Sequence, residues 1–145
     1  MKVFEAQIDI DAPIDVVWQH LTDFASYPAW NPYILSAEGD LKQDSVVRFK
    51  VAGLPMQLSA PIVSLVENQE LIWEARSPVP GMQPRYIRRL KKIDDNHTHF
   101  INREEFTGWA VPIMSPMLNL TSKPLFPKTC EALKQRVEAA MAQST

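Results

Sequence analysis

The middle of the chain limits the possible folds more than any other part. Between residues 34 and 108 apolar and polar side chains alternate in short runs, which turn residues such as Gly39 and Asp40 separate. The runs predict six strands, at residues 34–39, 45–51, 56–67, 70–77, 85–93 and 97–108. Because the connections are short, neighbouring strands should pair in order, and the pattern predicts an antiparallel meander.

The segment before the meander predicts one more strand and two short helices. Residues 3–11 alternate as a half-buried strand does. Helical spacing follows, with apolar residues at Ile14, Val17, Trp18, Leu21 and Phe24. We therefore expect a helix over residues 13–24. A second helical turn over residues 26–33 should be short, because Pro28 prevents a long continuation.

The last third of the chain changes character. Residues 109–120 are apolar and contain Pro112 and Pro116, so we expect a flexible, proline-broken segment there. Helical spacing then returns at Cys130, Leu133, Val137 and Met141, which predicts a long amphipathic helix. Pro124 and Pro127 should kink or restart this helix, so its continuous part is expected to begin near residue 127.

Two blocks of sequence resemble those of a known superfamily. Residues 12–32, "APIDVVWQHLTDFASYPAWNP", are similar to an opening pattern in which a proline starts the helix and a Tyr-Pro-x-Trp-Asn-Pro segment closes it. Residues 98–108, "THFINREEFTG", are similar to the block before the last helix. The superfamily is the START-like (SRPBCC) group, which includes the major birch pollen allergen, lipid-transfer START domains and bacterial polyketide cyclase/aromatases.

The resemblance implies an α+β helix-grip fold in a single START-like domain spanning residues 1–145. In that fold a curved antiparallel sheet of about seven strands wraps around a long C-terminal helix, and two short helices lie between the first two strands. The order of elements agrees, since the C-terminal helix is the only long amphipathic element available to cover the sheet. The resemblance also implies that a hydrophobic small molecule binds between sheet and helix.

Composition argues against other classes of partner. The net charge is −2 and no block of five like charges occurs, so nucleic acid is not expected. No apolar run reaches membrane-spanning length, which argues against stable membrane insertion, and the N-terminus starts in a strand pattern rather than a leader. The single cysteine, Cys130, suits a reducing compartment. We expect a cytoplasmic protein, and the sequence does not determine its oligomeric state.

The block at residues 97–108 predicts polar groups inside the protein. If Phe100 and Phe106 face inward, the two-residue period of a strand places Asn102 and Glu104 inward as well. The opposite phase would bury two charges and a histidine, so we reject it. The outward set is then His99, Ile101, Arg103 and Glu105.

Glu104 has several possible roles. It could hold the polar end of a ligand, act as acid or base in a cyclase-like reaction, form a structural ion pair with Arg88, or lie at the wet mouth of the sheet. Arg88 shares its face of the strand with Tyr86, which would place it inside. The other phase, with Ile87 and Ile93 inside, fits nearly as well.

Aromatic and methionine side chains complete the predicted site. Tyr27 and Trp30, in the aromatic turn at residues 24–33, could close one end of the cavity or simply plug the end of the core. The methionines of residues 109–120 could form an adaptable roof or pack as ordinary core. The predicted ligand-binding residues are Tyr27, Trp30, Phe49, Met56, Leu58, Trp73, Tyr86, Arg88, Phe100, Asn102, Glu104, Phe106, Met114, Met117 and Leu118.

Metal and cofactor signals are weak. His97 and His99 alternate after a turn, but no third ligand is near them in the sequence. The chain has no glycine-rich phosphate loop and no nucleophile elbow. We therefore expect neither a metal nor a cofactor.

Three functions fit these patterns. The first is binding or carrying of a hydrophobic small molecule such as a lipid, an aromatic polyketide or an isoprenoid, without catalysis. The second is a polyketide cyclase/dehydratase-type enzyme, in which Glu104, Asn102, Arg88 and Tyr86 would be the polar participants. The third is a protein-interaction module of the chaperone-activator kind, which a large exposed apolar patch would favour.

Overall fold

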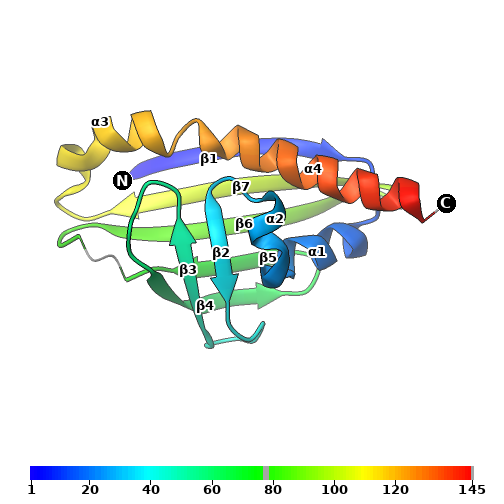
Figure 1. The fold of residues 1–145 in the computed structure, drawn as a ribbon, viewed down its shortest axis with the longest axis horizontal. Helices are drawn as coiled ribbons and strands as arrows, with labels where there is room; N and C mark the ends of the chain where they lie inside the picture. The colour runs from blue at the N-terminus through cyan, green and yellow to red at the C-terminus, as the bar shows by residue number, and fades with distance from the viewer. Residues whose placement is uncertain (77–78, 145) are drawn as a thin grey trace.

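The computed structural model describes residues 1–76 and 79–144 (Figure 1). The strands are β1 (Lys2–Ile10), β2 (Ile34–Glu38), β3 (Val46–Val51), β4 (Leu58–Val66), β5 (Glu70–Glu74), β6 (Gln83–Asp94) and β7 (His97–Thr107). The helices are α1 (Ile14–Thr22), α2 (Tyr27–Trp30), α3 (Val111–Thr121) and α4 (Leu125–Gln143), with a 3-10 turn at Phe24–Ser26.

Within the described residues the strands form one antiparallel sheet, in the order β1-β7-β6-β5-β4-β3-β2. Strands β2 to β7 pair consecutively, which confirms the predicted meander, and β1 pairs with β7 at the far edge. Register shifts between Ile34 and Ser36, and between Ile62 and Ser64, mark irregularities of the kind that bend a sheet. The sheet is curved and α4 lies along it, so the predicted helix-grip fold is confirmed (Figure 1).

Helix α4 closes the concave side of the sheet. Its buried residues are Phe126, Thr129, Cys130, Leu133 and Val137, which include three of the four positions that set the predicted stripe. The helix begins at Leu125, two residues before the expected start. Pro127 is tolerated because it lies in the first turn, where a backbone N–H has no partner within the helix.

The prediction for residues 109–120 was wrong, because Val111–Thr121 is a regular helix. Pro112 lies in its first turn, where the missing N–H costs nothing. Pro116 lies inside the helix and removes one hydrogen bond, which the remaining turns tolerate. The helix buries Val111 and Leu118 and exposes Ile113 and Leu120.

Two glycines fix where α3 starts. Gly81 and Gly108 have φ angles of 78° and 116°, which favour glycine. A Cβ on Gly108 would lie 2.1 Å from the Gly81 carbonyl oxygen, so the two turns touch through bare backbone. The Ala110 N–H donates to that same oxygen at 2.8 Å. This contact holds the beginning of α3 against the turn that precedes β6.

Candidate ligand-binding site

A cavity of about 240 Å³ lies beneath α3. We call it the outer cavity. Its walls are mostly apolar and come from α3, the end of β3, the following turn and the start of β6: Val51, Ala52, Gly53, Leu54, Met56, Leu58, Val79, Met82, Pro84, Met114, Met117 and Leu118, with Tyr33, Tyr86, Thr121 and Ser122 as the polar members. The volume lies just below the range of about 300–1,000 Å³ that is usual for small-molecule sites.

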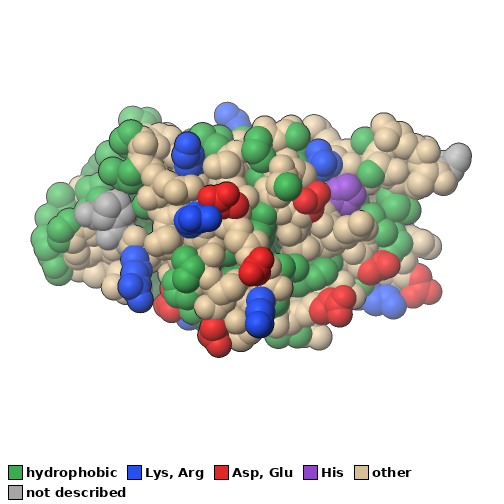
Figure 2. Space-filling view, turned by 60° about the horizontal axis from the view of Figure 1, so that its bottom comes forward, with side chains coloured by type: hydrophobic (Ala, Val, Ile, Leu, Met, Phe, Trp, Pro, Cys, Tyr) green, Lys and Arg blue, Asp and Glu red, His purple; other side chains and the backbone are tan. Residues whose placement is uncertain are grey.

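The surface around the outer cavity is also apolar. Leu54, Met56 and Met117, which line the cavity, are 39–46% exposed. Ile113 on α3, and Trp109 just before that helix, are more than 70% exposed. Figure 2 shows hydrophobic side chains gathered at the left end of the molecule, which is the α3 end in Figure 1. An apolar ligand would therefore meet apolar surface before it enters.

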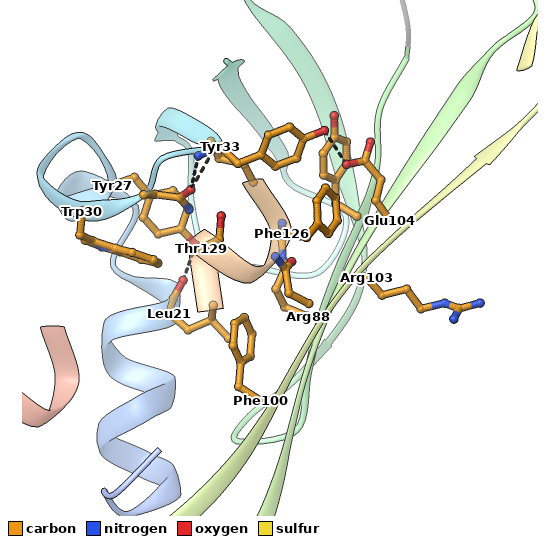
Figure 3. A pocket seen from close by; sticks show the side chains of 14 residues that line it. Leu21, Tyr27, Trp30, Tyr33, Arg88, Phe100, Arg103, Glu104, Phe126 and Thr129 are labelled. Atoms are coloured by element: carbon orange, nitrogen blue, oxygen red, sulfur yellow. Dashed lines mark hydrogen bonds between the residues drawn. The ribbon is translucent and has the colours of Figure 1, made fainter. Parts of the chain in front are cut away.

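A second, much smaller space lies between the aromatic turn, strands β6 and β7, and the start of α4. We call it the inner pocket; its volume of about 10 Å³ is close to the room that one water molecule needs. Tyr33 and Tyr86 line both spaces and therefore stand between them. Three of its polar residues, Arg88, Asn102 and Glu104, come from the neighbouring strands β6 and β7. Figure 3 shows Arg88 and Glu104 among the lining side chains.

Glu104 is a fully buried carboxyl. In the register it lies between Phe4 of β1 and Tyr86 of β6, and its side chain is 1% exposed. Tyr33 Oη donates to Glu104 Oε1 at 2.6 Å, while Oε2 has no partner (Figure 3). Burial raises the pKa of Glu104 to about 8, against the opposing effects of the Tyr33 hydroxyl, the Arg88 charge and the Tyr86 hydroxyl. The carboxyl is therefore mostly protonated at neutral pH.

Arg88 also points inward, on the face that it shares with Tyr86. It is 4% exposed, and its guanidinium carbon lies 3.9 Å from the centre of the Trp73 ring, a cation–π contact. Burial lowers the pKa of Arg88, while Tyr27, Tyr86 and Glu104 act in the opposite direction. Its Nε and Nη2 atoms have no hydrogen-bond partner. The alternative phase of β6 is wrong at Ile93, which is half exposed.

Asn102 confirms the inward phase predicted for β7. It is 7% exposed, between the buried Phe100 and Glu104, and its Nδ2 atom has no partner. The prediction that Ile101 faces solvent was wrong, since it is only 9% exposed. On this outer face Ile101 lies opposite Arg89, so a long side chain is available to cover it.

The aromatic turn packs as a plug. Tyr27 makes edge-to-face contacts with Phe24 and Trp30, at 5.6 and 5.2 Å between ring centres. Its hydroxyl donates to the Leu21 carbonyl, and Trp30 Nε1 donates to Ser26 Oγ at 3.0 Å. Burial raises the pKa of Tyr27 to about 12. Tyr27 and Trp30 therefore close the inner pocket and do not reach the outer cavity.

The structure divides the predicted binding residues into three groups. Those of the outer cavity are Met56, Leu58, Tyr86, Met114, Met117 and Leu118. Those of the inner pocket are Tyr27, Trp30, Tyr86, Arg88, Phe100, Asn102 and Glu104. Phe49, Trp73 and Phe106 line neither space, because their rings pack against Tyr86, Phe24 and Phe4 in the core.

Tyr33 is the important residue that the sequence did not identify. It is 4% exposed and contacts Glu104, Phe126 and Tyr86 through its hydroxyl or its ring. Burial is the largest of the effects that raise its pKa well above the ordinary value. The one sequence signal for Tyr33 was its place in the aromatic turn. A tyrosine that is buried there needs a hydrogen-bond partner for its hydroxyl.

Other kinds of site find no support in the residues described. Over residues 1–76 and 79–144 no group of three or more His, Cys, Asp or Glu side chains is placed to hold a metal ion. Among the helices of those same residues, none combines the length and apolar character that crossing a membrane requires.

The chain belongs to the polyketide cyclase / dehydrase and lipid transport family, whose model matches residues 1–138. This agrees with the fold and with the resemblance of its two sequence blocks. A search of curated proteins gave no significant match.

Solved structures resemble the fold at low identity. The Zhui aromatase/cyclase of a Streptomyces species is 18% identical, with a TM-score of 0.80 over 97% of this chain and 95% of that one. Norcoclaurine synthase of Thalictrum flavum is 12% identical, with a TM-score of 0.73 over 97% and 96%. Protein MLL2253 of Mesorhizobium loti is 13% identical, with a TM-score of 0.76 over 95% and 98%. At these identities the likeness concerns the fold alone.

Proposed function

We propose that the protein binds a hydrophobic small molecule in the outer cavity, with the polar end of the molecule directed at the inner pocket. The observation that carries this proposal is that the two spaces share Tyr33 and Tyr86 as lining residues. One space offers apolar walls, and the other offers four buried polar atoms without partners. Buried polar atoms are normally hydrogen-bonded, so a ligand or water that supplies the missing partners is favoured.

The family description supports this proposal, because it includes lipid transport. The methionine-rich wall suits a site that adapts to its ligand, since unbranched thioether side chains fill irregular gaps. Lipids, aromatic polyketides and isoprenoids of modest size remain the expected ligand classes. The cytoplasm remains the expected location, and nucleic acid remains an unexpected partner.

Filling the outer cavity tests the proposal. Leu118→Trp places a large ring on the buried side of α3, where Leu118 lines the cavity. Ile113→Trp is the matched control, because Ile113 lies on the same helix and is 71% exposed. With 1-decanol as the probe, thermal unfolding should show stabilisation of the wild type, about 2.7 kcal/mol at 100 times Kd.

The control variant should keep that stabilisation, and Leu118→Trp should lose it by at least about 100-fold in affinity. Equal stabilisation of both variants would place the ligand elsewhere. If neither decanol nor a panel of aromatic and isoprenoid alcohols stabilised the wild type, the cavity would have no role in binding.

A cyclase/dehydratase activity is the second candidate, and Glu104 favours it. Its carboxyl holds a proton at neutral pH beside an apolar cavity, which is the state that a general acid requires. Glu104→Gln should then reduce turnover of a poly-β-ketone substrate by about 10²–10⁴-fold while binding persists. Unchanged turnover in that variant would leave the binding function alone.

A further inference from the structure

The inner pocket holds a cation without a counter-charge. Arg88 belongs to none of the ion pairs formed among residues 1–76 and 79–144. The carboxyl whose charge acts on it, Glu104, is mostly neutral at pH 7 because burial raises its pKa to about 8. Burying an unpaired guanidinium is costly, so the pocket favours an anion.

The unpaired atoms indicate which anion. Nε and Nη2 of Arg88, both without partners, donate from the same edge of the planar guanidinium. That edge matches the two oxygens of a carboxylate, which bind it through parallel hydrogen bonds. Asn102 Nδ2 is a third unpaired donor, and Glu104 Oε2 belongs to a carboxyl that carries a proton below its pKa. The set is rich in donors, and its one carboxyl is mostly protonated at neutral pH.

We propose that the ligand is a hydrophobic carboxylate, whose apolar body fills the outer cavity and whose carboxylate binds side-on to Arg88 Nε and Nη2. Asn102 Nδ2 donates to the same group. This inference rests on the proposed binding function and adds the chemical class of the ligand to it.

Tyr33 controls access to Arg88. The inner pocket has room for one water molecule and not for a carboxylate, so a side chain must move. Tyr33 borders both spaces and is held by the 2.6 Å hydrogen bond to Glu104. When Tyr33 turns away, a ligand oxygen can reach Glu104 Oε2, which has no partner and can donate the carboxyl proton to it. Oε1 then loses the hydrogen bond that it accepts from the Tyr33 hydroxyl.

The experiment compares a carboxylic acid with the alcohol of the same chain length. Decanoic acid and 1-decanol are titrated calorimetrically at pH 7 into the wild type, Arg88→Met and Arg89→Met. Arg89 is the matched control, because it follows Arg88 on β6 but pairs with Glu70 on the outer face. Arg88→Met should fold, since it removes an unpaired buried charge, and Arg88→Gln serves as a second variant that keeps a polar side chain.

We expect the wild type and Arg89→Met to bind the acid at least about tenfold more tightly than the alcohol, a difference of about 1.4 kcal/mol. Both Arg88 variants should lose this preference. Equal binding of acid and alcohol by the wild type would mean that water alone occupies the inner pocket, and would overturn the inference while the proposed function stands. A preference that survived in Arg88→Met would also overturn it. Failure of both compounds to bind would overturn the inference and the proposed function together.

Discussion

The outer cavity and the inner pocket share Tyr33 and Tyr86, yet they differ in volume and in the polarity of their walls. The outer cavity is roomy, apolar and lined by four methionines, with walls that are partly exposed to solvent. The inner pocket is nearly filled, and its lining includes the buried residues Arg88, Asn102 and Glu104, which carry polar atoms that lack partners. This difference favours separate roles in the proposed binding function, in which the outer cavity would accommodate an apolar body and the inner pocket would select its polar end.

Helix α3 and strand β7 explain this division. One part of the apolar wall comes from α3, a helix whose other side is exposed, so its side chains have room to adapt. The polar groups stand on β6 and β7 in the middle of the sheet, where pairing on both sides holds the backbone. Adaptable walls suit a loose fit, and rigid strands suit precise recognition.

The largest expected effect concerns the charge state of the inner pocket. The pKa of Glu104 is raised from 4.5 in the unfolded chain to about 8 in the folded protein. The folded state therefore binds more protons than the unfolded state, and Glu104 makes stability fall as pH rises from about 4.5 to 8. Glu104→Gln should remove this fall, a change of a few kcal/mol, as measured by urea unfolding across that pH range.

Glu105→Gln is the control for the same strand, since Glu105 pairs with Arg103 on the outer face. Its stability should follow the wild-type dependence on pH. If Glu104→Gln also followed the wild type, Glu104 would be ionised at neutral pH, and the inner pocket would not differ from an ordinary buried ion pair.

Arg88→Met gives the next largest effect. Replacing a buried, unpaired charge with an apolar side chain of similar length should raise the free energy of unfolding by about 1–4 kcal/mol. The outer cavity offers the contrast, because Leu118→Ala removes apolar contacts and should lower stability. The denaturant midpoints of Arg88→Met and Leu118→Ala measure the two changes in stability. Strong destabilisation by Arg88→Met would show that Arg88 is a structural residue.

Tyr33→Phe should have the smallest effect. It removes the hydroxyl that donates to Glu104 Oε1 and leaves that oxygen without a partner, at a cost of about 1–2 kcal/mol. Because the Tyr33 hydroxyl lowers the pKa of Glu104, its loss should raise that pKa further. Chemical unfolding and the pH dependence of stability measure both changes. If the pH dependence of stability were unaltered, the Tyr33 hydroxyl would have no effect on the pKa of Glu104.

The sequence predicted the fold well, because alternation and helical spacing are local signals. The inward direction of Asn102 and Glu104 followed from Phe100 and Phe106 on the same strand. The sequence left both phases of β6 open for a physical reason. Apolar residues occur on both of its faces, since Ile87 is buried on the outer face as fully as Tyr86 is inside.

The parts that could not be predicted depend on contacts between distant segments. Tyr33 and Glu104 are 71 positions apart, and only the closure of the fold brings the hydroxyl to the carboxyl. The helical state of Val111–Thr121 was hidden by its prolines, whose cost depends on their place within the helix. Which aromatic residues line a space and which fill the core depends on packing across the curved sheet, as the contact of Phe49 with Trp73 shows.

The most direct test of the proposed binding function uses the methionines. The chain has six, of which Met56, Met82, Met114 and Met117 line the outer cavity, while Met1 and Met141 lie outside it. Methyl-labelled methionine should give NMR signals whose positions are recorded as 1-decanol is added. We predict that the four cavity signals shift together to saturation while those of Met1 and Met141 stay in place. Signals that all stay in place, or that shift most at Met1 and Met141, would contradict ligand binding in the outer cavity.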